Sequence, residues 1–193
     1  MRLFVDELHY GWKEGVALGR LSFTLGPGKL LVVQGVNGSG KTSLMLTLGG
    51  VLRPLAGTVR LRGAGDLPLR QHSFYLGPQL QFYPLLTAIE NASFLLRIRS
   101  LAVGLLPHVL HKYGVPERRK VCELSTGQVQ RLRLACAAAA EQPLLLLDEP
   151  GLSLDAAGRA ALRELILRYK GLVILASNDP GEVALADRAI SLA

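Results

Sequence analysis

Residues 35–42 read Gly-Val-Asn-Gly-Ser-Gly-Lys-Thr and match the phosphate-binding loop pattern G-x-x-x-x-G-K-[ST]. Residues 30–33 before the loop are a short apolar run of the kind that forms a fully buried strand. Residues 42–48 after it suit a helix that stops at Gly49 and Gly50. The loop therefore lies between a predicted strand and a predicted helix, which is the context that the pattern requires.

The residue types in this loop suit a polyphosphate ligand. Glycines let the backbone turn its N–H groups toward an anion without interference from a Cβ atom. The helix that follows directs its positive end at the same place. Lys41 can reach the outer phosphates, and the Thr42 hydroxyl can ligate Mg²⁺. A glycine-rich turn that binds nothing is a poor alternative, because the lysine, the hydroxyl and the flanking strand all agree with the pattern.

The composition is that of a compact domain. The chain has 193 residues, of which 49% are hydrophobic, enough for a sizeable core. No run of about 18 apolar residues lacks a charge, proline or glycine, so we expect no transmembrane helix. Acidic residues near the N-terminus argue against a signal peptide, and Cys122 and Cys136 are expected to be reduced and packed. We expect a protein that is cytosolic or bound to a membrane surface.

The chain is basic, with a net charge of +7. Such a charge could attract nucleic acid or an anionic membrane surface. The arginines are scattered rather than run together, which favours solubility and attraction to a membrane face over a nucleic-acid groove. We therefore expect no nucleic-acid partner.

Two stretches before the loop predict strands of an antiparallel β layer. Residues 2–9 and 18–25 alternate imperfectly between apolar and polar side chains, as half-exposed strands do. Between them, Tyr10 and Trp12 are two positions apart and would share one face of a strand. Either ring could stack on an adenine base, and ordinary packing within the sheet is an equal alternative.

The middle of the chain predicts a small helical insert. Thr87 and Glu90 form a capping-box pattern that opens a helix to about Arg99. Residues 105–113 predict a second helix that ends at Gly114. Because this part of the chain carries apolar periodicity, we interpret it as a packed subdomain rather than a linker.

A second capping-box pattern, Ser125 with Gln128, opens a long helix over residues 126–140. The remaining predicted elements are strands at 58–62, 73–77, 144–147, 172–176 and 189–192, and helices at 156–170 and from 181. This order predicts the α/β fold of a P-loop NTPase, with a mainly parallel sheet.

Two acids follow the leucine-only strand at 144–147. Ligand sites in open α/β sheets lie at the carboxyl ends of the strands. Asp148 could hold Mg²⁺ through water, and Glu149 could polarise an attacking water. The pair alone would also suit a solvated strand end, but a phosphate loop at the same sheet favours the catalytic interpretation.

Taken in order, these motifs resemble those of an ATP-binding cassette (ABC) ATPase, and they cover nearly the whole chain. The matching segments are Walker A at 35–42, the Q-loop glutamine at Gln79, the signature at 124–128, Walker B at 144–149 and the D-loop at 153–155. Many NTPases share Walker A, whereas a signature directly upstream of Walker B is specific to this family. The resemblance implies one ATP-binding domain over residues 1–193, with a helical subdomain at about 80–140.

The resemblance also implies how the site works. Two such domains close head to tail as a homodimer, and each ATP is held between Walker A of one copy and the signature of the other. The residues implied to bind ATP are Gly35, Val36, Asn37, Gly38, Ser39, Gly40, Lys41, Thr42 and Ser43, with Tyr10 or Trp12 on the base and Ser125, Gly127 and Gln128 from the signature. The residues implied to hold Mg²⁺ are Thr42, Gln79 and Asp148.

The same resemblance assigns roles in hydrolysis. Glu149 would activate the water, Lys41 would stabilise the γ-phosphate, and Gln79 would sense Mg²⁺ and the partner. Asp155 would contact the opposite subunit. The chain is therefore expected to be an ATPase, that is, a hydrolase whose turnover drives a translocase.

Two positions depart from the family pattern. Thr126 stands where a glycine is usual, and because the Gly127 N–H is kept, we expect the change to be tolerated. Asn178 stands where the switch histidine is expected. Asparagine can donate a hydrogen bond to a γ-phosphate, but it cannot carry a proton or a positive charge. We therefore predict slow hydrolysis, with Asn178 as the fourth catalytic position beside Lys41, Gln79 and Glu149.

Residues 75–79 and 86–91 resemble those of the small ATPase of bacterial cytochrome c maturation exporters, the haem-handling type. The brevity of the chain agrees with that group. The resemblance implies an integral-membrane permease as partner and a peripheral location on the cytoplasmic face of the cell membrane. A cytoplasmic helix of that permease would dock where Phe82, Tyr83, Leu85 and Leu86 lie, unless these side chains pack internally.

Two other functions remain as alternatives. A soluble ABC protein of DNA repair or translation would carry two cassettes, a coiled coil or a basic insert, and the sequence has none of these. A nucleotide-binding scaffold with little catalysis is favoured by Asn178 but opposed by Glu149, because an inactive site would not need a base.

Overall fold

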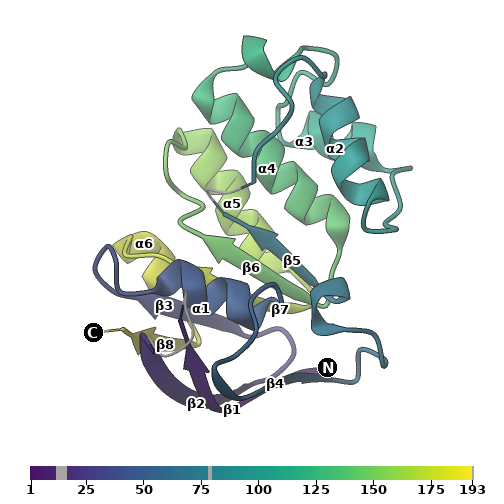
Figure 1. Ribbon diagram of the computed structural model, residues 1–193. Helices are drawn as coiled ribbons and strands as arrows, with labels where there is room; N and C mark the ends of the chain where they lie inside the picture. Colours follow the sequence, from purple (N-terminus) through teal and green to yellow (C-terminus); the bar gives the residue numbers. More distant parts are fainter. Residues whose placement is uncertain (12–16, 78–79, 193) are drawn as a thin grey trace. The chain divides into compact units, whose positions relative to one another are not determined.

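The computed structural model describes residues 1–11, 17–77 and 80–192 of the chain (Figure 1). Contacts divide it into two compact units. The first unit comprises residues 1–77, 142–149 and 169–193, and the second comprises residues 78–141 and 150–168. The first unit contains both β-sheets, and the second contains four helices of seven or more residues.

A parallel sheet of five strands forms the centre of the first unit. Its order is β5-β6-β7-β3-β8. The strands are β3 (Leu30–Gln34), β5 (Ser73–Leu76), β6 (Leu144–Asp148), β7 (Leu172–Ala176) and β8 (Arg188–Ser191). Two of the three inner strands, β6 and β7, are buried along their whole length, as their apolar sequences predict. The predicted α/β class is confirmed.

An antiparallel sheet of order β2-β1-β4 forms a second layer of this unit. Its strands are β1 (Arg2–Tyr10), β2 (Gly19–Leu25) and β4 (Ala56–Arg62). The layer predicted from the first two strands is confirmed, and the predicted strand at 58–62 joins it beside β1. The register of β1 shifts at a bulge where Glu7 has a φ of 47°. A Cβ at Gly57, which has a φ of 77°, would overlap the Glu7 backbone, so only glycine fits there.

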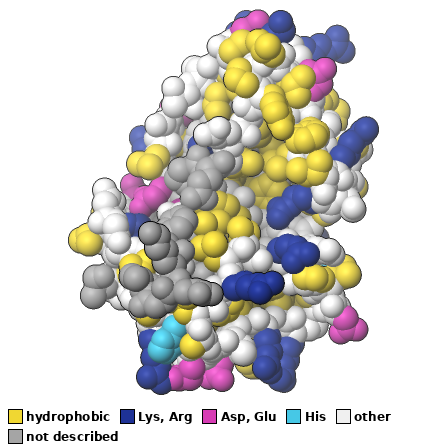
Figure 2. Space-filling model, in the orientation of Figure 1, with side chains coloured by type: hydrophobic (Ala, Val, Ile, Leu, Met, Phe, Trp, Pro, Cys, Tyr) yellow, Lys and Arg dark blue, Asp and Glu magenta, His cyan; other side chains and the backbone are white. Residues whose placement is uncertain are grey.

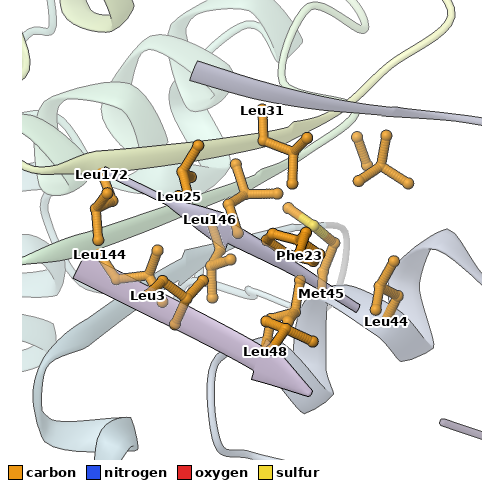
Figure 3. Close-up of a cluster of buried hydrophobic side chains, with 14 of the residues drawn as sticks. Leu3, Phe23, Leu25, Leu31, Leu44, Met45, Leu48, Leu144, Leu146 and Leu172 are labelled. Atoms are coloured by element: carbon orange, nitrogen blue, oxygen red, sulfur yellow. The ribbon is translucent and has the colours of Figure 1, made fainter. Parts of the chain in front are cut away.

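Apolar side chains fill the space between the two sheets. Figure 3 shows Leu3, Phe23 and Leu25 from the antiparallel layer meeting Leu31, Leu144, Leu146 and Leu172 from the parallel sheet, with Leu44, Met45 and Leu48 from helix α1. Helix α1 (Lys41–Leu48) contacts β6 and β7 of one sheet and β1 of the other. Burial of this kind is the main stabilising term in folding, and here it fixes the helix that starts at the phosphate loop.

The second unit is helical. Its helices are α2 (Ala88–Arg97), α3 (Leu106–Lys112), α4 (Thr126–Ala140) and α5 (Ala156–Arg168), and α4 packs against the other three. The two predicted capping boxes, Thr87 with Glu90 and Ser125 with Gln128, are both present. Helix α5 groups with this unit, although the sequence analysis placed the helical subdomain only at about 80–140.

Short elements complete the chain. They are two 3₁₀ turns, η1 (Leu69–Gln71) and η2 (Val121–Glu123), and the last helix, α6 (Pro180–Val183). Among the described residues, none of the helices is both long enough and apolar enough to cross a membrane. Both cysteines are free thiols, as predicted. Cys136 is buried, but Cys122 is exposed, so the prediction that both are packed is wrong for Cys122.

Candidate active site

The phosphate loop joins the end of β3 to the start of α1. Gly40 precedes the helix with a φ of 90°, a left-handed conformation that favours glycine, and a Cβ there would lie 2.9 Å from Leu18 Cδ1. Val36, Asn37 and Gly38 form the exposed outer part of the loop. The start of α1 has no side-chain cap, so its first N–H groups have no partner within the helix and can face a ligand.

Lys41, the lysine of the loop, is folded back onto the loop. Its Nζ donates hydrogen bonds to the carbonyl oxygens of Gly35 (2.6 Å) and Val36 (3.3 Å). The same Nζ lies 3.6 Å from Glu149 Oε1 in a largely buried ion pair. The oxygens of a bound polyphosphate could therefore replace these carbonyl oxygens as acceptors for an ammonium group that already lies over the loop.

The predicted acids lie at the carboxyl end of β6, beside the loop. Asp148 is only 3% exposed, and its Oδ2 accepts a hydrogen bond from Thr42 Oγ1 at 2.7 Å. Glu149 follows with a φ of 51°, which is uncommon for a residue other than glycine. Its N–H donates to the Ala176 carbonyl of β7. Of the two adjacent carboxylates, that of Asp148 thus contacts Thr42 and that of Glu149 contacts Lys41.

A tyrosine that the sequence analysis did not predict for this site also reaches Asp148. Tyr75 Oη, from β5, donates a hydrogen bond to Asp148 Oδ2 at 2.9 Å. Burial and the nearby carboxylate raise the pKa of Tyr75, so its phenol remains a proton donor at neutral pH. The order of strands in the sheet brings the two residues together, and that order cannot be obtained from local sequence patterns.

Asn178 follows β7 and contacts the first residue of the loop. Its Oδ1 accepts a hydrogen bond from the Gly35 N–H (3.2 Å), and its Nδ2 donates one to the Gly35 carbonyl (2.9 Å). The asparagine thus binds both polar groups of one loop residue. The side chain at the predicted switch position therefore lies against the first residue of the phosphate loop.

The residues present fit a nucleotide with magnesium. The hydroxyl groups of Ser39 and Ser43 are buried and have no hydrogen-bond partner among the described residues. Buried polar atoms normally have partners, so these hydroxyls suit an oxygen-rich ligand. Thr42 and Asp148 offer the oxygen ligands that Mg²⁺ prefers. No group of three His, Cys, Asp or Glu residues that could hold a metal occurs in the described part of the chain.

The start of helix α4 lies in the second unit. Ser125 Oγ accepts a hydrogen bond from the Gln128 N–H (3.2 Å), and Gln128 Oε1 accepts one from the Ser125 N–H (2.9 Å). Ser125 and Thr126 are exposed, and Gly127 is half-buried. A capped and accessible helix start of this kind can bind an anion. Asp155 caps α5 by accepting a hydrogen bond from the Gly158 N–H at 2.7 Å.

The structure separates the two aromatic candidates for the base. Tyr10 is 1% exposed in the core of the first unit, so a base could reach neither face of its ring. The alternative of ordinary packing is correct for Tyr10, and the predicted stacking on its ring is wrong. Trp12 and the Q-loop residue Gln79 lie outside the described residues.

The phosphate loop and the acid pair together mark the first unit as a P-loop nucleotide-binding domain. A family model described as ABC transporter matches residues 18–151. The chain therefore belongs to the ABC transporter family, as one of its ATP-binding subunits. Membership of this family implies ATP binding and hydrolysis.

Individual relatives agree with this family. The chain is 38% identical over 188 residues to the cytochrome c biogenesis ATP-binding export protein CcmA of Brucella abortus, covering 93% of this chain and 86% of the relative. It is 40% identical over 172 residues to the CcmA protein of Bordetella bronchiseptica, covering 83% and 77%. The post-hydrolysis dimer of the ATP-binding cassette MJ0796 with ADP and Pi matches with a TM-score of 0.82 and 22% identity, covering 98% of this chain and 94% of that one. The last likeness establishes the fold.

Proposed function

We propose that this chain hydrolyses ATP to drive an ABC exporter through a separate integral-membrane permease. The observation that carries the proposal is the position of Glu149, whose carboxylate lies 3.6 Å from the phosphate loop's lysine. A carboxylate beside the lysine that meets the terminal phosphate is well placed to act as the general base for a water.

The chain's own groups supply most of the chemistry. When ATP binds, Lys41 donates to phosphate oxygens instead of to the carbonyl oxygens of Gly35 and Val36. The negatively charged phosphate attracts the ammonium group more strongly than the neutral carbonyl groups do. Glu149 is released from Lys41 by the same exchange and accepts a proton from the attacking water. Thr42 and Asp148 would hold Mg²⁺, which would supply positive charge to offset that of the phosphates. Gln79 is proposed to complete the metal site.

A second copy of the chain completes each site in this proposal. The exposed start of α4 in one copy, with Ser125, Gly127 and Gln128, meets the γ-phosphate held by the loop of the other copy. Closure is then head to tail and depends on ATP. Trp12, as the remaining aromatic candidate, is proposed to stack on the adenine.

Exposed apolar side chains in the second unit support docking to a permease. Tyr83 is 55% exposed and Leu85 74%, while Phe82 and Leu86 are half-buried. The ring of Phe94, from α2, meets Tyr83 edge to face with the centroids 5.5 Å apart. Figure 2 shows hydrophobic side chains gathered over the part of the molecule where α2 and α3 lie. We name Tyr83, Leu85 and Phe94 the apolar patch; such patches commonly mark interaction sites.

One buried residue holds the loop that carries this patch. Asn91, from α2, is buried; its Oδ1 accepts a hydrogen bond from the Tyr83 N–H at 2.7 Å. Its Nδ2 donates to the carbonyl oxygens of Tyr83, Leu86 and Thr87 at 3.0 to 3.2 Å. The patch is therefore presented on a fixed backbone, which lowers the entropic cost of docking.

Co-purification from native membranes tests the proposed partner. The full chain should carry an integral-membrane permease with it, and Leu85→Asp should reduce the recovered permease at least about tenfold, since a buried unpaired charge opposes docking. Leu167→Asp is the matched control, because Leu167 is an exposed leucine on α5 of the same unit. Equal recovery with both variants, or no membrane protein with the unaltered chain, would contradict the proposal.

The transported compound is proposed to be haem for cytochrome c biogenesis. This step rests on the names of the relatives at 38% to 40% identity. With it, we propose that the chain lies on the cytoplasmic face of the cell membrane. Cells that lack the chain should then lose c-type cytochromes with covalently bound haem, detected by haem staining of separated proteins. Normal c-type cytochromes in such cells would contradict haem as the transported compound. The chain would then belong to an ABC exporter of another compound.

Slow hydrolysis is proposed from Asn178. Its amide is neutral and is already bonded to Gly35, so it offers the γ-phosphate no positive charge. Asn178→His should raise the single-turnover rate at least about tenfold, because a charged donor stabilises the developing negative charge. The rate is measured with the permease present. Asn178→Ala, which removes both bonds to Gly35 and adds no donor, is the control and should not be faster; a histidine variant no faster than the unaltered chain would refute slow turnover at this position.

A further inference from the structure

Tyr75 makes a contact that the proposed hydrolysis does not use. Its hydroxyl and the Thr42 hydroxyl donate to the same oxygen, Asp148 Oδ2, at 2.9 and 2.7 Å. Asp148 is buried, and among the described residues it has no cationic partner. A carboxylate buried without a cation is costly unless donors or a bound metal offset its charge. The tyrosine thus acts directly on the residue that is proposed to face Mg²⁺.

Two donors on one oxygen fix the orientation of a carboxylate. The hydrogen bond from Thr42 alone would allow Asp148 to rotate about its side-chain bonds. The second bond, from the Tyr75 ring on the neighbouring strand β5, holds Oδ2 from another direction. Mg²⁺ demands nearly ideal octahedral geometry, so the orientation of its carboxylate partner affects how well it binds.

A glycine next to the Q-loop makes room for the tyrosine. A Cβ at Gly77 would overlap the hydroxyl and ring of Tyr75, and its distance from Tyr75 Cε1 would be 2.8 Å. The backbone at this position therefore passes directly over the phenol. Any larger residue at 77 would displace the ring and with it the bond to Asp148.

We propose that Tyr75 is a positioning residue of the magnesium site, which orients Asp148 for the metal, and that Gly77 is required because it admits the tyrosine ring. This inference rests on the proposed ATP site. It assigns to Tyr75 no contact with the nucleotide. The chain's affinity for the metal should therefore depend on the hydroxyl, whereas its affinity for the nucleotide without metal should not.

Metal binding without turnover tests this inference. The full chain is kept in excess over a non-hydrolysable ATP analogue, Mn²⁺ replaces Mg²⁺, and free Mn²⁺ is measured by electron paramagnetic resonance. Tyr75→Phe should bind Mn²⁺ about tenfold more weakly, which is typical when a partner of a metal ligand is lost. Its affinity for the analogue in EDTA should be unchanged.

Tyr169→Phe is the matched control. It also removes a tyrosine hydrogen bond of the first unit, that to the Gln142 carbonyl at 2.7 Å, but at the opposite end of β6. It should bind Mn²⁺ as the unaltered chain does. Gly77→Ala should reproduce the loss of Tyr75→Phe and should add nothing to it in the double variant, because the hydroxyl is then already absent.

Two outcomes are decisive. If Tyr75→Phe binds Mn²⁺ as tightly as the unaltered chain, the hydroxyl only joins two strands and the inference is overturned. If the unaltered chain binds the analogue neither with Mn²⁺ nor in EDTA, the ATP site itself is refuted, and this result is distinct from the first.

Discussion

Glu149→Gln should lower ATP hydrolysis at least about a hundredfold while ATP binding is retained, since a general base contributes two to four powers of ten to a rate. The amide has nearly the shape of the carboxylate but cannot accept the proton of the attacking water. The left-handed backbone at residue 149 and the 3.6 Å approach to Lys41 hold this side chain at the phosphate loop. Removing its basicity should therefore affect chemistry more than binding.

The measurement is a single-turnover assay with labelled ATP, beside equilibrium binding of a fluorescent ATP analogue. Glu141→Gln is the matched control, because Glu141 is also a glutamate in a left-handed conformation, at the end of α4. It should hydrolyse ATP at the unaltered rate. Equal rates for Glu149→Gln and the unaltered chain would contradict the catalytic role and favour a nucleotide-binding scaffold.

Lys41→Ala should weaken ATP binding roughly ten- to a hundredfold, since a hydrogen bond to a charged group contributes about 1.5–3 kcal/mol. The substitution removes the only side-chain charge that is held over the loop by the Gly35 and Val36 carbonyl oxygens within the described residues. No neighbouring side chain there can restore it.

Titration with a fluorescent ATP analogue measures this loss, and thermal unfolding checks that the variant is folded. Lys29→Ala serves as the control: Lys29 belongs to the same unit but pairs with Asp187 at 2.7 Å, at the amino end of β3. It should bind the analogue normally. An unchanged affinity in Lys41→Ala would show that the nucleotide does not bind at this loop.

Local features of this fold were predictable from sequence because each depends on a few adjacent residues. The phosphate loop at 35–42 needs only its glycines, its lysine and its flanking apolar runs. The capping boxes at Thr87 and Ser125 each join residues three positions apart, so both were predicted and are present. The buried strands β6 and β7 follow from unbroken apolar runs.

Contacts that depend on strand order could not be predicted in the same way. Asp148 meets Tyr75 because β5 pairs with β6, and Asn178 meets Gly35 because β7 pairs with β3. Neither pairing is encoded by spacing along the chain. The position of Tyr10 could not be predicted for another reason. The alternation along its strand predicts which side chains lie on the same face as Tyr10, but not that this face belongs to the core.

Sedimentation equilibrium of the Glu149→Gln chain, with and without saturating ATP, tests the central claim that a second copy completes the nucleotide site. We predict a dimer with ATP and a monomer without it. Ser125→Arg in the same background should still bind ATP but should remain a monomer, because the bulky side chain blocks the exposed start of α4. A Glu149→Gln chain that stays monomeric with ATP bound, or that dimerises equally well with Ser125→Arg, would contradict the claim.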